Sequence, residues 1–165
     1  MNKIPESELV LNPDGSVYHL KLRPEHIANT VLIAGDPNRV NMISAHFDSI
    51  EHKIQNREFT THTGIYKGIR LTALSTGIGT DNIDIAINEL DAAVNINLES
   101  REIKDDFRKL EIIRLGTSGA LQADVEVDSC VISTHGLGLD GLLNFYKVPE
   151  GVIDQAMSQA FITHS

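Results

Sequence analysis

Three arginines of this chain each belong to a short motif that forms turns or contains glycine. In chain order the motifs are GDPNR (residues 35–39), REFT (residues 57–60) and RLGTSG (residues 114–119). Guanidinium groups donate paired hydrogen bonds to tetrahedral oxyanions, and glycine lets main-chain N–H groups approach the same anion. The three segments together therefore predict a phosphate-binding site.

The GDPNR motif directly follows the apolar run Val31–Ala34, which is typical of a strand. Pro37 suits the first turn of a helix, so the motif predicts a turn from a strand end to a helix start. Such a turn brings free N–H groups and the positive end of the helix dipole together, where Gly35 and Arg39 could bind phosphate. A purely structural turn is the alternative.

Arg114 follows the apolar residues Ile112 and Ile113, and half of its surroundings are expected to be apolar. A guanidinium in such a place needs a partner, because an unpaired buried charge is costly. The partner could be an anion held together with Gly116 and Thr117. A carboxylate such as Glu89 or Asp124 would serve as well, and the residues alone leave both open.

Arg57 and His19 carry weaker signals. Arg57 and Glu58 are neighbouring opposite charges, which are also typical of a solvated strand edge. His19 lies between Tyr18 and Leu20, where a packed strand histidine is more common than a ligand. The histidines show no metal-binding spacing, and the single cysteine cannot form an internal disulfide. We therefore expect no transition-metal cofactor, and Cys130 is expected in a buried strand.

Composition sets the broad class. The 165 residues are 41% hydrophobic and 22% charged, with a formal net charge of −9. This length suits a soluble domain with a real core, and the negative charge argues against nucleic acid or an anionic membrane as partners. We find no signal-like or membrane-spanning apolar run, and with the lone cysteine this predicts a cytoplasmic protein.

Apolar periodicity predicts alternating strands and helices. Strands are expected at 17–22, 30–34, 50–60, 61–66, 69–75, 112–115 and 130–134, with a Lys67–Gly68 turn. Helices are expected at 37–47, at 81–94 with Asp81 as the cap, and at 151–162. Residues 98–110 are expected to form either a helix extension or a surface insertion.

This pattern predicts an α/β fold, a three-layer αβα sandwich with a mixed β-sheet. Residues 1–16 are expected to form a loose N-terminal arm, and residues 17–165 part of a single domain. The last helix has no strand after it to complete the sheet, so we expect a chain truncated at its C-terminus.

Two glycine-rich matches carry less weight. The segment GLGLDG (residues 136–141) fits the dinucleotide-binding spacing, but Pro149 and Gly151 interrupt any long helix behind it. Residues 116–119 lack the full spacing of a nucleophile elbow. Neither a Rossmann site nor a serine hydrolase is predicted.

The motifs GDPNR, REFTT, STGIG and RLGTSG, in this order, resemble those of nucleoside phosphorylases of the uridine phosphorylase type. The match runs from Val17 to about Gly141. The segments VYHL (residues 17–20) and REFT favour uridine phosphorylases over the purine enzymes. The resemblance implies a nucleoside phosphorylase-like fold of which this chain is the N-terminal part.

The resemblance also implies roles for matching residues. Phosphate would be bound by Gly35, Arg39, Arg57, Arg114, Gly116 and Thr117, with Arg39 and Arg114 as catalytic groups. His19 would bond the ribose 5′-hydroxyl of a partner subunit's nucleoside, and Thr117 would lie near the ribose. Arg57 and His19 would serve a neighbouring subunit's site, since family members share sites within dimers. A monovalent cation could lie near Glu58, Ile78 and Asn82, although asparagine replaces the family's serine there.

The implied reaction is phosphorolysis of uridine to uracil and ribose 1-phosphate, a pentosyl transfer of nucleotide salvage with inorganic phosphate as co-substrate. The implied assembly is a homo-oligomer of dimers, either a dimer or a hexamer. Base recognition would lie beyond Ser165, so base choice is not encoded in this chain. The alternatives are a purine nucleoside phosphorylase and a non-catalytic phosphate- or nucleoside-binding module.

Overall fold

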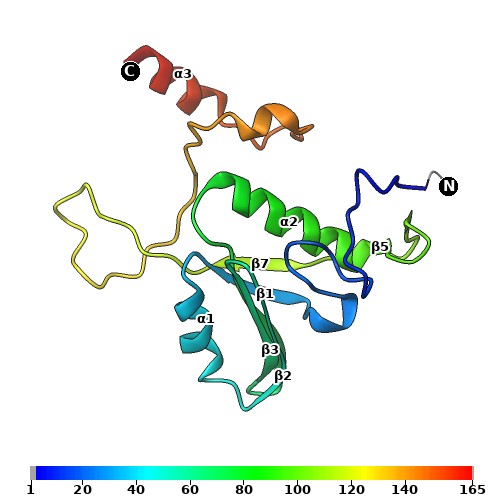
Figure 1. The fold of residues 1–165 in the computed structure, drawn as a ribbon. Helices are drawn as coiled ribbons and strands as arrows, with labels where there is room; N and C mark the ends of the chain where they lie inside the picture. Colours follow the sequence, from blue (N-terminus) through cyan, green and yellow to red (C-terminus); the bar gives the residue numbers. More distant parts are fainter. Residues whose placement is uncertain (1–2, 165) are drawn as a thin grey trace. The chain divides into compact units, whose positions relative to one another are not determined.

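A computed structural model describes residues 3–164 of the chain (Figure 1). These residues fall into two compact units, which divide between Gly119 and Ala120. The first unit contains the sheet, the hydrophobic core and the three arginine motifs.

A five-stranded mixed sheet forms the centre of the first unit. Its elements are β1 (Thr30–Ala34), α1 (Pro37–Ser44), β2 (Ser49–Asn56), β3 (Phe59–Tyr66), β4 (Ile69–Ser75), α2 (Thr80–Asn95) and β7 (Glu111–Arg114). The strand order is β2-β3-β4-β1-β7. Strands β2, β3 and β4 are antiparallel, whereas β1 runs parallel to both β4 and β7. The predicted mixed sheet is confirmed.

The three parallel strands end at one edge of the sheet. Ala34 of β1 is paired with Ser75 of β4, and Ile33 lies opposite Arg114 of β7. Carboxyl ends of parallel strands are where α/β proteins place their ligand sites. The register therefore brings the chain segments that follow β1, β4 and β7 together.

Two tight hairpins connect the antiparallel strands. The predicted Lys67–Gly68 turn is confirmed, and both residues have positive φ (48° and 79°), as a two-residue hairpin loop requires. The first hairpin differs from expectation, because a strand was predicted to continue through residues 50–60. Instead Asn56 pairs with Phe59, and Arg57 and Glu58 form the loop, with Arg57 at φ 54°.

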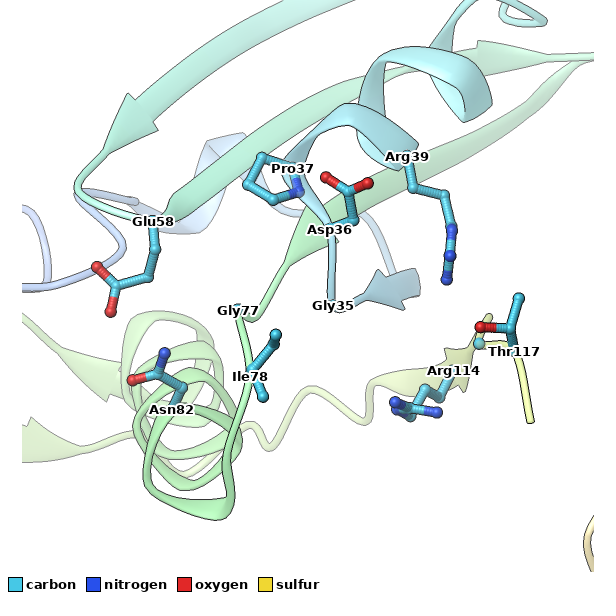
Figure 2. Close-up of a pocket in the computed structure, with 11 residues that line it drawn as sticks. Gly35, Asp36, Pro37, Arg39, Glu58, Gly77, Ile78, Asn82, Arg114 and Thr117 are labelled. Carbon is cyan, nitrogen blue, oxygen red and sulfur yellow. The ribbon is translucent and has the colours of Figure 1, made fainter. Parts of the chain in front are cut away.

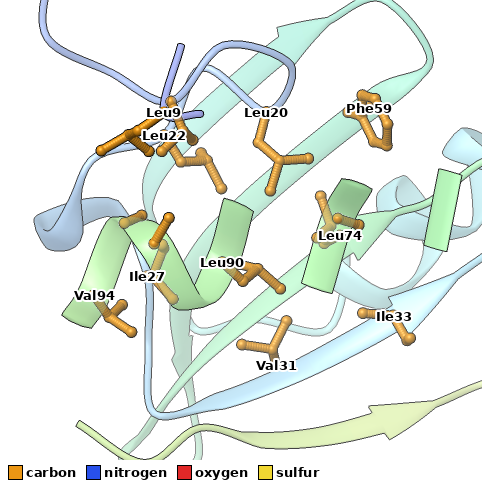
Figure 3. Close-up of a cluster of buried hydrophobic side chains, with 14 residues drawn as sticks. Leu9, Leu20, Leu22, Ile27, Val31, Ile33, Phe59, Leu74, Leu90 and Val94 are labelled. Carbon is orange, nitrogen blue, oxygen red and sulfur yellow. The ribbon is translucent and has the colours of Figure 1, made fainter. Parts of the chain in front are cut away.

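The helices cover the sheet on both faces. Helix α1 packs on β1, β3 and β4, with Val40 fully buried. Leu90 and Val94 of α2 belong to a core cluster on the other face, together with Val31 and Ile33 of β1 (Figure 3). Side chains of a strand alternate between faces, so Val31 and Ile33 turn to α2.

Helix α2 begins one residue after Gly79, whose φ of 108° is not helical. The predicted Asp81 cap is therefore wrong, and Asp81 lies in the first turn instead. A carboxylate there still interacts favourably with the helix dipole.

The segment expected to be a loose arm makes defined contacts. The Ile4 N–H donates to the Arg101 carbonyl at 2.9 Å, and Leu9 is buried. The strand predicted at 17–22 is a turn, with the Lys21 N–H bonded to the Val17 carbonyl at 3.0 Å. Lys21 has φ 56°, and this reversal lets Val17, Leu20 and Leu22 all face the core without strand alternation.

Residues 98–110 are a surface insertion rather than a helix extension. The end of α2 leads into a small antiparallel pair, β5 (Ile96–Asn97) and β6 (Glu102–Ile103). Arg108 anchors the return of the chain, donating to the Asn29 side chain at 2.7 Å and to the Pro24 carbonyl at 3.2 Å.

The second unit is mostly irregular, with a 3-10 turn at Leu142–Phe145 and helix α3 at Gln155–His164. The strand predicted at 130–134 is absent from it, and Cys130 is exposed rather than buried. The apolar run predicted a strand, but a strand forms only beside another strand, and residues 120–164 contain none. No helix within residues 3–164 is both long enough and apolar enough to cross a bilayer.

Candidate phosphate-binding site

A hollow of about 600 Å³ lies at the carboxyl edge of the parallel strands (Figure 2). It is lined by Gly35, Asp36, Pro37, Arg39, Glu58, Gly77, Ile78, Asn82, Arg114, Gly116 and Thr117. Two of the three arginines predicted to form one site, Arg39 and Arg114, thus lie around one hollow, whereas the REFT motif contributes Glu58 and not Arg57. The loop between β4 and α2 supplies the third wall.

Arg39 is fixed by the turn that precedes it. The Asp36 carboxylate accepts from the Asn38 N–H at 2.9 Å and caps α1, while the Asp36 carbonyl accepts from the Arg39 N–H at 3.0 Å. These N–H groups are engaged within the turn, which differs from the expectation that they are free for an anion. The Gly35 N–H has no protein acceptor within residues 3–164, so this N–H, the Arg39 side chain and the helix dipole are available to an anion on this side.

The Arg39 guanidinium reaches across to the other motif. Its Nη1 donates to the Leu115 carbonyl at 3.1 Å, and the Leu115 N–H in turn donates to the Ile33 carbonyl at 2.8 Å. A guanidinium has five N–H donors. One bond to Leu115 leaves the others available to a ligand in the hollow.

Arg114 lies at the end of β7 and folds over Gly116. A Cβ atom at position 116 would stand 2.4 Å from Arg114 Nη1, so only glycine leaves room for this guanidinium. Within residues 3–119, Glu89 forms no ion pair with Arg114 and bonds to His19 instead. The Glu89 alternative for Arg114 is therefore not realised.

Main-chain donors come from the segment after β7. Within the described part of the chain, the Gly116 and Thr117 N–H groups donate to no protein acceptor. With the two guanidinium groups and the Thr117 hydroxyl, they form a set of donors suited to the oxygens of a tetrahedral anion.

The opposite wall of the hollow is acidic and amide-lined. Figure 2 shows Glu58 and Asn82 on the side away from Arg114 and Thr117. Both side chains close around Gly77, where an added Cβ would stand 2.7 Å from Asn82 Nδ2 and 3.4 Å from Glu58 Cγ. The three positions named for a monovalent cation, Glu58, Ile78 and Asn82, thus line the same hollow. Residues 3–164 contain no cluster of three His, Cys, Asp or Glu side chains that could hold a metal ion.

Arg57 does not line the hollow, although its neighbour Glu58 does. The left-handed conformation at Arg57 sends the two side chains in different directions. The Arg57 guanidinium donates to the Tyr18 hydroxyl at 3.2 Å and lies 5.3 Å from the centre of the Tyr18 ring. This is a cation–π geometry.

His19 also lies outside the hollow and in the neighbourhood of Arg57. Its ring meets that of Tyr18 edge-on, with centroids 4.9 Å apart. Its Nδ1 is 2.7 Å from the Glu89 carboxylate. No local sequence signal could have shown this role of Glu89, because the two residues are 70 positions apart.

The model of the phosphorylase superfamily matches residues 29–164, which include two of the arginine motifs of the hollow and the REFT hairpin. The chain belongs to the phosphorylase superfamily. This confirms the resemblance drawn from the motifs.

The relatives of this chain include proteins named for pyrimidine nucleosides and proteins named for purine nucleosides. A uridine phosphorylase of Thermococcus kodakarensis is 35% identical over 146 residues, which are 88% of this chain and 48% of the relative. A guanosine phosphorylase of Halorubrum lacusprofundi is 36% identical over 132 residues, 80% of this chain and 49% of the relative. The chain spans about half the length of the curated relatives it matches.

A solved superfamily structure shares the fold. The crystal structure of a Trypanosoma brucei nucleoside phosphorylase, described as showing uridine phosphorylase activity, superposes with a TM-score of 0.66 and 36% identity. The match covers 72% of this chain and 41% of that one. The nucleoside phosphorylase-like αβα fold expected from the sequence is thereby confirmed for the part of the chain that is matched.

Proposed function

We propose that the full-length protein is a uridine phosphorylase, which converts uridine and inorganic phosphate to uracil and ribose 1-phosphate. The observation that carries the proposal is the meeting of Arg39, Arg114, Gly116 and Thr117 around one hollow at the end of the parallel strands. The similarity to proteins named uridine phosphorylase supports the choice of substrate.

The chemistry follows from charge. Breaking the glycosidic bond leaves positive charge on the ribose, and a phosphate held beneath the anomeric carbon stabilises that charge before attacking it. Arg39 and Arg114 need transfer no proton, because they position the nucleophile and keep its charge in place. A hydrolytic enzyme, which uses water, would have no need of paired guanidinium groups here.

We further propose that the enzyme is a homo-oligomer with sites shared between subunits. Arg57 and His19 are absent from the lining of the hollow and cluster around Tyr18 instead. Two residues expected to contact phosphate and ribose would thus serve a neighbouring subunit's site. The reducing cytoplasm is proposed as the location because the one cysteine has no second cysteine to pair with.

A purine nucleoside is the second candidate substrate, favoured by the 36% identity to a guanosine phosphorylase. The experiment is phosphate-dependent release of uracil from uridine, with inosine and guanosine assayed in parallel. Uracil release that requires phosphate supports the proposal, and release only from the purine nucleosides selects the alternative. No turnover by a folded sample that binds phosphate would indicate a binding module.

A further inference from the structure

The Glu89 carboxylate on α2 holds both the main chain and the ring of His19. It accepts from the His19 N–H at 2.9 Å and from the Leu20 N–H at 2.8 Å. Its Oε1 also lies 2.7 Å from His19 Nδ1. The Glu89 side chain is 15% exposed, so this is a largely enclosed carboxylate to which three donors converge.

This contact decides which ring nitrogen carries the proton. An ionised carboxylate only accepts hydrogen bonds, so the nitrogen that faces it must be Nδ1–H. In the neutral ring, Nε2 then has a free lone pair. The His19 side chain is 30% exposed, and Nε2 makes no hydrogen bond to any residue within 3–164.

The main-chain carbonyl and the ring of His19 have further contacts to Asn56 and Tyr18. Asn56 Nδ2 donates to the His19 carbonyl at 2.7 Å, and the Tyr18 ring meets the imidazole edge-on. With its main chain bonded to both α2 and β2, the ring has little freedom to leave Glu89. The same cluster includes Arg57 through its bond to Tyr18.

We propose that Glu89 is a positioning residue that fixes His19 as the Nδ1–H tautomer, so that Nε2 is presented as a hydrogen-bond acceptor to a ligand hydroxyl. This rests on the proposed function and on the family resemblance, by which His19 would bond the ribose 5′-hydroxyl of a neighbouring subunit's nucleoside. The role resembles that of the carboxylates that orient histidine ligands of metals, where the second partner selects the tautomer.

The substitution Glu89→Gln separates this role from simple packing. Glutamine has the shape of glutamate, but one of its two acceptor oxygens becomes an NH₂ donor. The single amide oxygen would accept from the main-chain N–H groups of His19 and Leu20, so the NH₂ group would face His19 Nδ1. That contact favours the tautomer in which Nδ1 accepts and Nε2 carries the proton. The matched control is Glu99→Gln, the same substitution at an exposed position, since the Glu99 side chain has no hydrogen bond to any residue within 3–164.

The first measurement is the tautomer itself, read at pH 8 from long-range ¹H–¹⁵N correlations of the histidine-labelled 165-residue chain. Loss of one ring signal in His19→Gln assigns His19. We expect Nδ1–H in the unaltered chain and in Glu99→Gln, and a shift toward Nε2–H in Glu89→Gln. An Nε2–H ring in the unaltered chain overturns the proposal, whether or not the variants fold.

The second measurement is the ratio of kcat/KM for uridine to that for 5′-deoxyuridine in the full-length enzyme. We expect Glu89→Gln to lower this ratio about tenfold, as the loss of one hydrogen bond would. A merely structural role would lower both substrates by the same factor, and that result overturns the proposal. If the unaltered enzyme releases uracil from neither substrate, the proposed function fails, whereas the tautomer measurement still tests Glu89.

Discussion

The guanidinium of Arg39 donates a hydrogen bond to the main-chain carbonyl of Leu115, at 3.1 Å. One arginine motif is thereby attached directly to the other. Because the register also places Ile33 opposite Arg114, the two motifs are held by main-chain as well as side-chain bonds. The donors of the hollow are therefore preorganised, which is the condition for strong electrostatic stabilisation.

Replacing Arg114 with alanine should raise the phosphate KM and lower kcat of the full-length enzyme. We expect kcat/KM for phosphate to fall roughly 100-fold, about 3 kcal/mol of transition-state stabilisation. Steady-state kinetics at varied phosphate concentrations would measure it. Lys109→Ala removes the same charge from an exposed site outside the hollow and should have little effect. Unchanged phosphate dependence in Arg114→Ala would remove the residue from the site.

Gly116→Ala should weaken phosphate binding while the fold remains stable. The added Cβ would meet the end of the flexible Arg114 side chain, which can move away but then leaves its position over the hollow. Thermal unfolding should change little, and phosphate affinity should fall roughly tenfold. Gly119→Ala is the matched control, because nothing lies within 4 Å of its Cβ. Equal affinities in the two variants would contradict the arrangement.

Mixing inactive variants should restore activity if Arg57 serves a neighbouring subunit. In an exchanged oligomer of Arg57→Ala and Arg114→Ala chains, one site regains both arginines. Up to about a quarter to half of the activity should return, depending on how the chains pair. A mixture of Arg39→Ala and Arg114→Ala should show no rescue, because both residues line the hollow of one chain. Proven exchange without rescue would exclude the shared site.

Thr61→Val should stabilise the fold. The Thr61 hydroxyl is buried and has no hydrogen-bond partner within the described residues. Removing an unsatisfied polar group should raise the free energy of unfolding by about 1 kcal/mol. Thr63→Val should have the opposite effect, because its hydroxyl donates to the His26 carbonyl at 2.6 Å. Urea unfolding of both variants measures these changes in the free energy of unfolding. A loss of stability in Thr61→Val would show that the Thr61 hydroxyl does have a hydrogen-bond partner.

The stability of the fold should fall between pH 7.5 and pH 5.5, and His62 should contribute to the fall. Burial, and secondarily the charge of Lys53, lowers the pKa of this histidine below its usual value. In this window the unfolded chain binds more protons at His62, so its stability contribution is present above about pH 6.5 and is lost as pH decreases.

His62→Gln should reduce the slope of unfolding free energy against pH and can keep a hydrogen bond to Ser44, which lies 2.7 Å from His62 Nδ1. Denaturant unfolding at a series of pH values measures the slope. His46→Gln, at an exposed position, controls for the loss of a histidine. An unchanged slope in His62→Gln would show that this ring does not titrate on unfolding.

Local sequence was enough to determine the family, the mixed αβα sheet and most of the hollow. The motifs GDPNR and RLGTSG each specify their own turn through proline and glycine, and the apolar runs before them specify strands. The carboxyl ends of parallel strands meet at one edge of a sheet, which brings Arg39 and Arg114 together. The strand order that puts β1 between β4 and β7 was not predicted from the motifs and is seen only in the structure.

Only the tertiary structure decided what lies outside the hollow and which partners are used. The 17–22 segment has a strand-like pattern, but Val17, Leu20 and Leu22 reach the core through a turn. Glu58 lines the hollow and Arg57 does not, because the two residues form a hairpin loop in which Arg57 has a positive φ. Glu89 binds His19 rather than Arg114, a choice between partners far apart in the chain. Such contacts depend on how helices and loops pack, and local pattern does not record that packing.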